Sequence, residues 1–232
     1  MSDATEKRSS RPWFIVGLVA VLLLFVGGFF IFIVASQKDT PSPEPTSSAP
    51  SASAPVSDSV CGLEGFELES TLDSAPDADW SLVGTLASPS NETSGPGIIE
   101  ADGFRSCYAR TAEGALFAVA NFVALGTDAS LRERQLLLIA SGPGRDAVRD
   151  ALGEGEPSNL RGAIAGFQVG SYTSDGATVD LVIGYSDGRL VSVPVKVIWE
   201  DGDWKVVFTS AGQTPLSPAI IANLGGYIPW GN

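Results

Sequence analysis

The chain has 232 residues, and its 27 Asp and Glu residues outnumber its 14 Lys and Arg residues, so the net charge at pH 7 is −13. Such an acidic chain lacks the basic face that displaces counterions from nucleic acid, and anionic lipid headgroups repel it. The sequence contains no histidine, which removes the commonest general base and the commonest metal ligand. We therefore expect no nucleic-acid partner, no metal, no cofactor and no catalytic residues.

The amino-terminal part predicts a membrane anchor. Residues 1–12 are polar and carry Lys7, Arg8 and Arg11, whereas residues 13–35 form an uncharged, mostly apolar run. A helix of that length is about 35 Å long, enough to cross the hydrocarbon core of a bilayer. The preceding basic residues place the amino terminus in the cytoplasm. A cleaved signal peptide would have a shorter apolar region and a clearer small-residue cleavage site, so we favour one uncleaved transmembrane helix in the cell membrane.

The remainder predicts a spacer followed by one extracytoplasmic domain. Residues 36–60 are rich in Pro, Ser and Ala and poor in apolar side chains, which is typical of a disordered stalk. Residues 61–232 are long enough to bury a single core. We divide the domain into an acidic wrapping segment (61–110), helices (111–153), a sheet (161–209) and a tail (210–232).

The wrapping segment carries charges of one sign over most of its length: residues 61–104 contain nine acidic residues and no Lys or Arg. Its apolar residues are too sparse for independent folding, although Trp80–Leu86 predicts a short strand. The acidic spacing does not match a calcium-binding EF-hand loop, so we favour a solvated acidic face. Asn91-Glu92-Thr93 matches a glycosylation sequon, a pattern that is frequent by chance.

Cys61 and Cys107 are the only cysteines, and both lie in the part that we place outside the cell. Two cysteines in an oxidising compartment most simply form one disulfide. In the chain-entropy model, closing a loop of about 45 residues stabilises the fold by about 4 kcal/mol. A catalytic redox site or a metal site would need a CxxC spacing or further ligands, and the sequence has neither.

Three helices are predicted next. Thr111 is a suitable N-cap for a helix that ends at Leu125, and the helix is apolar nearly all round, which indicates burial. A second helix runs from Ala129 to Ser141 and is broken by Gly142-Pro143-Gly144. A third, short helix covers Arg145 to Leu152.

Four strands follow between Ala163 and Phe208, because apolar residues alternate there and three Asp-Gly turns separate the runs. Pro194, inside the third strand, indicates an edge or a bulge. Helices followed by strands predict an α+β fold in which the helices pack on one face of a curved, antiparallel, four-stranded meander. In the tail, Ala219–Asn223 predicts a short helical piece, and Tyr227–Trp230 is expected to pack at the rim.

The Ala-rich helix, the curved meander and its ending at Trp199-Glu-Asp-Gly-Asp-Trp-Lys205 resemble the nuclear transport factor 2-like superfamily. Cys107-Tyr-Ala and Thr111-Ala-Glu-Gly-Ala-Leu116 further resemble an uncharacterised actinobacterial family, whose members join one membrane span and a Pro/Ser stalk to such a domain. Some members are similar in layout to components of conjugative transfer machinery. The resemblance covers residues 61–232 and implies a cone of helices and bent sheet, with no assigned catalytic residues to carry over.

These observations favour a non-catalytic, membrane-anchored, extracytoplasmic interaction or assembly domain of a cell-envelope complex. Conjugative-transfer or secretion machinery would supply its envelope protein partners, and the sequence does not indicate an oligomeric state. The alternative is a small-molecule binding module, in which the cone cavity is lined by Phe117, Phe122, Phe167 and Trp204.

An enzyme is the third hypothesis. Without histidine, only strand residues such as Tyr172, Asp180 and Tyr185 remain as proton-transfer groups. Asp180 lies between Val179 and Leu181, opposite the apolar face, so we interpret it as a solvent-facing strand carboxylate.

Overall fold

The computed structural model describes residues 59–152 and 161–232. The predicted cytoplasmic tail, the membrane anchor and nearly all of the stalk lie outside the described residues. Within the two described ranges, no single helix combines the length and the apolar composition that a membrane crossing requires.

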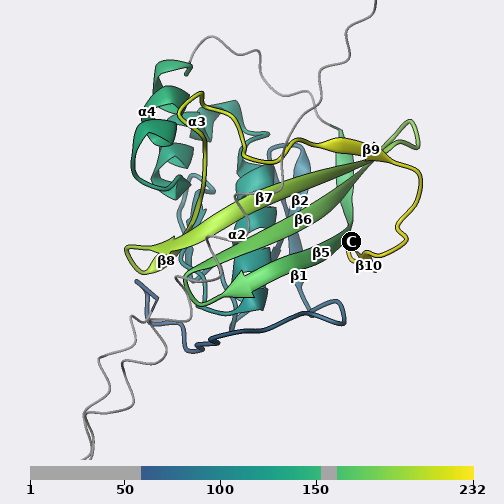
Figure 1. Cartoon of the computed structure of the whole chain (residues 1–232), viewed down its shortest axis with the longest axis horizontal. Coiled ribbons are helices and arrows are strands. Elements are labelled where there is room, and N and C mark those ends of the chain that lie inside the picture. Colours follow the sequence, from purple (N-terminus) through teal and green to yellow (C-terminus); the bar gives the residue numbers. More distant parts are fainter. Residues whose placement is uncertain (1–58, 153–160) are drawn as a thin grey trace, which may run out of the picture. The chain divides into compact units, whose positions relative to one another are not determined.

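The largest element is an antiparallel sheet of six strands (Figure 1). Four of the strands follow one another as a meander: β5 (Gly162–Thr173), β6 (Gly176–Tyr185), β7 (Leu190–Glu200) and β8 (Asp203–Val206). In the last turn, Asp201 and Gly202 both have positive φ, 55° and 77°. Two positive φ angles are characteristic of a type I′ turn, whose twist matches that of the strands.

The prediction of a four-stranded sheet is wrong, because the carboxyl-terminal tail adds two strands. β9 (Ala219–Ile221) pairs with β7, and β10 (Ile228–Pro229) pairs with β5. The helical piece predicted at Ala219–Asn223 is wrong for the same reason: a short apolar run has no reliable period, and the edge of β7 offers it hydrogen bonds. The chain therefore does not adopt the nuclear transport factor 2-like arrangement of helices on four strands.

Strand β7 explains where the sheet tolerates a proline. On the side away from β6, β7 pairs with β9 through Leu190–Ser192 and with β8 through Val197–Glu200. Pro194 lies in the interval between these two ladders. Proline has no N–H to contribute to a ladder, so it is accommodated at this interruption.

Three α-helices occur in the described ranges: α2 (Ala112–Leu125), α3 (Arg132–Gln135) and α4 (Pro143–Asp150). The predicted continuous helix from Ala129 to Ser141 is wrong. Two 3-10 turns, η1 (Ala129–Leu131) and η2 (Leu136–Leu138), flank the single turn of α3 instead. Leu131 and Leu138 are both buried, and the tighter turns allow both side chains to reach the core.

Helix α2 lies between the sheet and a hairpin formed by β1 (Asp79–Val83) and β2 (Leu86–Ser90) (Figure 1). A second pair of short strands, β3 (Ile98–Ile99) and β4 (Arg105–Ser106), follows before the helix begins. The wrapping segment is thus organised into two short antiparallel pairs. It covers the face of α2 that the sheet leaves open.

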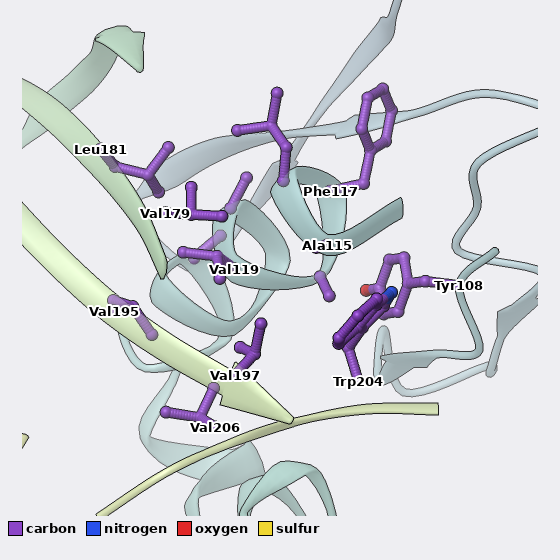
Figure 2. Packing of buried hydrophobic residues seen from close by; sticks show 14 of the residues in the cluster. Tyr108, Ala115, Phe117, Val119, Val179, Leu181, Val195, Val197, Trp204 and Val206 are labelled. Atoms are coloured by element: carbon purple, nitrogen blue, oxygen red, sulfur yellow. The ribbon is translucent and has the colours of Figure 1, made fainter. Parts of the chain in front are cut away.

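The core is the contact between α2 and the inner face of the sheet. Figure 2 shows Val179, Leu181, Val195 and Val197 of the sheet directed toward Val119 and its neighbours on the helix. Each side chain of this size contributes roughly 1.5–3 kcal/mol when it is fully buried. The alternating apolar residues of β6 and β7 therefore account for the way the helix is held.

The tail contributes an anchor as well as two strands. The Trp230 ring lies 4.9 Å from that of Trp80, 5.5 Å from that of Phe117 and 5.4 Å from that of Phe167, measured between ring centroids. Its Nε1 donates to the carbonyl of Pro76, so the polar edge is also satisfied. Trp230 thereby joins the last residues of the chain to β1, α2 and β5.

Candidate functional site

The predicted disulfide is confirmed. Cys61 and Cys107 are bonded, and their Cα atoms are 6.1 Å apart. Cys107 is completely buried, and Cys61 is exposed. The bond attaches the start of the wrapping segment to the residues that lead into α2.

The four aromatic residues predicted to line a cavity belong to, or pack against, the core cluster. Phe117, Phe167 and Trp204 are almost completely buried, and Phe122 is half-buried with its ring 6.2 Å from that of Phe208. The Trp204 Nε1 donates to the carbonyl of Ala109. None of the four lines the cleft described below.

The three residues considered for proton transfer do not meet. The Tyr172 hydroxyl lies at the inner side of the sheet, and its single O–H is shared between the carbonyl oxygens of Arg110 at 2.9 Å and Glu67 at 3.1 Å. Burial raises its pKa. Asp180 is half-buried on the outer face, where its carboxylate accepts hydrogen bonds of 2.8 Å from Ser192 and Tyr227. Tyr185 lies under the guanidinium of Arg189. Asp180 therefore holds the carboxyl-terminal tail on the outer face of the sheet, through the hydrogen bond that it accepts from Tyr227.

A small cleft of about 250 Å³ opens at the amino-terminal end of α2. Three parts of the chain form its walls: the beginning of the wrapping segment, the loop between β2 and β3, and the residues that lead into α2 together with its first turn. Its lining residues are Glu64, Gly65, Glu67, Leu72, Thr93, Ser94, Ala109, Thr111 and Glu113. Three of these are glutamates, and none is Lys or Arg.

Local hydrogen bonds hold two of the glutamates. Glu67 accepts from the backbone N–H of Ala112 at 2.8 Å, while the N-cap residue Thr111 accepts from the N–H of Gly114 at 3.0 Å. The first N–H groups of a helix have no partner within the helix, so both acceptors stabilise α2. The Glu67 amide in turn donates to the carbonyl of Arg110. A residue 45 positions away in sequence thus caps the helix, which sequence reasoning missed.

Glu113 organises the opposite wall. Its Oε1 accepts from Asn91 Nδ2 and from Ser94 Oγ, each at 2.7 Å. Asn91 Oδ1 accepts from the backbone N–H groups of Thr93 and Ser94. The side chain of the sequon asparagine is therefore fully engaged in shaping the loop.

Glu64 differs from the other two glutamates. It is exposed, and in residues 59–152 and 161–232 its carboxylate has no hydrogen bond and no ion pair. It lies at the mouth of a cleft whose lining includes no compensating positive side chain. The helix amino terminus offsets part of the negative charge, but its effect falls off within the first turn.

The arrangement favours an organic cation over a metal ion or a large ligand. Among the described residues, no three His, Cys, Asp or Glu side chains converge so that they could hold a metal. Small-molecule pockets usually measure about 300–1,000 Å³, so the cleft is closer in size to one side chain. A Lys or Arg side chain of a partner protein combines the required charge and size.

Arg110 lies in sequence between two lining residues, Ala109 and Thr111, but does not itself line the cleft. Its guanidinium lies between the rings of Phe66 and Trp199, 5.3 Å and 5.2 Å from their centroids. It also donates to the carbonyl of Ser174 and pairs with Asp175 at 2.7 Å. Phe66 is 40% exposed, so an apolar surface borders the acidic one.

Comparison with known proteins gives one match. A family model described as "Domain of unknown function (DUF8175)" matches residues 41–229. No curated protein and no solved structure matches the chain. The likeness to the actinobacterial membrane-anchored family stays a prediction. Because the family model covers most of the sequence, the chain belongs to this DUF8175 family of domains of unknown function.

Proposed function

We propose that the chain is a non-catalytic, extracytoplasmic interaction domain of a cell-envelope complex, held at the cell membrane by its amino-terminal residues. It binds a positively charged segment of an envelope protein partner. The binding site is the acidic cleft at the start of α2, and a Lys or Arg side chain of the partner enters it.

The observation that carries this proposal is the charge of the cleft. Glu64, Glu67 and Glu113 line a hollow of about 250 Å³ without any basic lining residue. At an effective dielectric constant of about 20, a unit charge about 4 Å from another interacts with an energy of about 4 kcal/mol, so an incoming cation gains substantially. The surrounding segment from 61 to 104 carries no Lys or Arg, which extends the negative field beyond the cleft.

The positions of the ionisable side chains support binding rather than catalysis. Asp180 accepts hydrogen bonds from Ser192 and Tyr227, and the Tyr172 hydroxyl donates to the backbone carbonyl of Arg110. General acid–base catalysis needs a proton donor and acceptor within reach of the same substrate atom. The cleft glutamates instead act as helix cap and loop organiser, which leaves Glu64 as the group available to a partner.

The test uses the full-length protein in detergent and a fluorescein-labelled trilysine peptide, with binding measured by fluorescence anisotropy. We expect Glu64→Lys to weaken binding by about tenfold or more, because it exchanges an attraction for a repulsion. Glu64 has no intramolecular partner among the described residues, so the fold should be unaffected. Binding should also weaken when the salt concentration is raised from about 0.02 M to about 0.5 M.

Glu133→Lys is the matched control. Glu133 is an exposed glutamate of α3. Helix α3 follows the carboxyl-terminal end of α2, and α2 is about 20 Å long, whereas the cleft lies at the amino-terminal end of α2. The net charge changes equally in both variants, so only a local effect distinguishes them. Equal weakening by both variants, or a labelled triglutamate peptide that binds as well as trilysine, contradicts the proposal. In native membranes, cross-links to a partner that Glu64→Lys abolishes and Glu133→Lys preserves would extend it to the complex.

A further inference from the structure

We infer that the Cys61–Cys107 disulfide is a redox-sensitive clamp on the acidic cleft, and that its reduction by a dithiol loosens one wall and weakens the binding of cationic segments. This inference rests on the proposed function and adds its regulation. It concerns the same cleft and requires no further ligand.

The disulfide joins the beginning of the wrapping segment to the residues that lead into α2, and both of these parts of the chain contribute walls of the cleft. Cys61 precedes Glu64 by three residues, and Cys107 precedes Ala109 by two. Glu64 and Ala109 both line the cleft. The bond covalently links two residues that lie 46 positions apart in the sequence. The spacing between the walls near Glu64 therefore depends on it.

The Cys107 side is held independently of the bond. The backbone N–H groups of Cys107 and Tyr108 each donate to the buried carboxylate of Asp203 at 3.1 Å. The carbonyl of Cys107 accepts from Gly97, and the Ala109 amide donates to the carbonyl of Ser94. This wall should keep its position after reduction.

The Cys61 side is held much less. The Val60 amide donates to the carbonyl of Gly202, and along the described chain the next backbone amide that reaches a distant residue is that of Glu67. Between these points the hydrogen bonds of the wall are local, except that the Cys61 amide donates to Cys107 Sγ. Reduction therefore leaves Glu64 on a short segment that has only local hydrogen bonds and the packing of Leu63 beside Gly97, while Glu67 remains attached to α2.

The chemistry is ordinary thiol–disulfide exchange. A thiolate of the dithiol attacks the sulfur of Cys61, the more exposed of the two residues, the bond between the two cysteine sulfurs breaks, and a mixed disulfide forms. The second thiol of the reagent then displaces Cys61. The protein gains two electrons and two protons as two thiols, and the dithiol becomes a disulfide. Cys61 is exposed and Cys107 is buried, which determines the side of attack.

The experiment compares the full-length protein before and after treatment with dithiothreitol, using the labelled trilysine peptide and following reduction by mass spectrometry. We expect binding to weaken about fivefold to tenfold, because the cleft loses its preorganised wall. Hydrogen exchange should accelerate at residues 62–66 and stay slow in α2. The double variant Cys61→Ser/Cys107→Ser should bind as weakly as the reduced protein and should not respond to dithiothreitol.

The outcomes separate this inference from the proposed function. If the oxidised protein does not bind trilysine, the proposed function itself fails. If the oxidised and reduced proteins bind trilysine equally, the proposed binding at the cleft is retained and its regulation by the disulfide is overturned. If exchange in α2 accelerates as much as at residues 62–66, the disulfide merely stabilises the whole domain, and the clamp is likewise overturned.

Discussion

Two regions of the molecule are held together in different ways: the sheet with α2, and the wrapping segment 61–110. Helix α2 is attached to β6 and β7 by buried aliphatic side chains such as Val119, Val179 and Val197. The wrapping segment is attached by individual polar contacts, by one disulfide and by a few apolar anchors such as Leu86 and Tyr108. Apolar packing excludes hollows, whereas separate directional contacts leave space between them, so the cleft lies where the two regions meet.

The polar side of this contrast is clearest at Arg105 of β4. The residue is buried, and its guanidinium donates to Asn121 Oδ1 at 3.3 Å and to Ser81 Oγ at 2.6 Å, both neutral acceptors. Burial lowers its pKa. A charged arginine loses hydration when it is buried, and this loss costs free energy. The aliphatic side chains between α2 and the sheet carry no charge and have no such cost.

The contrast predicts its largest effect in the packed region. Trp204→Ala removes a side chain that is 2% exposed and contacts the rings of Tyr172 and Trp199. We expect the free energy of unfolding to fall by about 3–5 kcal/mol, measured by urea denaturation. Trp80→Ala, in the wrapping segment and half-buried, is the control and should cost less. An equal or larger loss for Trp80→Ala would mean that the two regions do not differ as described.

A smaller effect is expected where the two regions touch. A Cβ atom at Gly114 would collide with the carbonyl oxygen of Ala109, which lies at the end of the wrapping segment. Gly→Ala inside a helix normally stabilises by about 1 kcal/mol. Here we expect Gly114→Ala to destabilise by about 1–3 kcal/mol, because the backbone must shift.

Gly170→Ala is the control for this substitution. Gly170 lies in β5, where a Cβ atom would meet only the Thr178 carbonyl oxygen, at an ordinary contact distance of 3.8 Å, and its φ is not in the left-handed region. We expect it to be neutral or stabilising in the same urea denaturation measurement. A stabilising Gly114→Ala would show that the wrapping segment moves away easily.

The smallest effect is expected at an exposed contact of the wrapping segment. Arg134 of α3 pairs with Glu100 and Asp102 and lies over the ring of Phe104. A hydrogen bond from the Phe104 amide, and then one from Arg134, hold the pKa of Asp102 below its ordinary value of 3.8. A lowered pKa contributes stability that is present above the ordinary value and is lost as the pH falls through the lowered one.

We therefore expect Arg134→Gln to raise the pKa of Asp102 toward its ordinary value, with the Phe104 amide still keeping it slightly low. Titration of the carboxylate followed by NMR measures this directly. The stability that Asp102 contributes above its ordinary pKa should then be smaller, and its loss on acidification should be complete at a higher pH than in the unmodified protein. Arg189→Gln, which removes the partner of Asp187, is the control and should leave Asp102 unchanged. An unaltered Asp102 titration in Arg134→Gln would show that the ion pair does not form in solution.

The sequence alone determined the elements that depend on neighbouring residues. Asp201-Gly202 has the backbone freedom that its hairpin needs, and the alternation in β6 and β7 sets one face of the sheet. Thr111 caps α2 because its hydroxyl reaches an N–H three residues away. The pairing of Cys61 with Cys107 followed from their being the only two cysteines. All of these follow from local spacing or from counting.

Only the tertiary structure decided the rest, because it depends on residues far apart in sequence. The strand β9 exists because β7 has an unpaired edge beside it, not because Ala219–Ile221 has a strong preference of its own. Glu67 caps a helix that begins 45 residues later, and Asp180 meets Tyr227 across 47 positions. The cleft forms from three such segments, and no local pattern encodes a space between them. Packing and loop closure, which act over the whole chain, place these groups together.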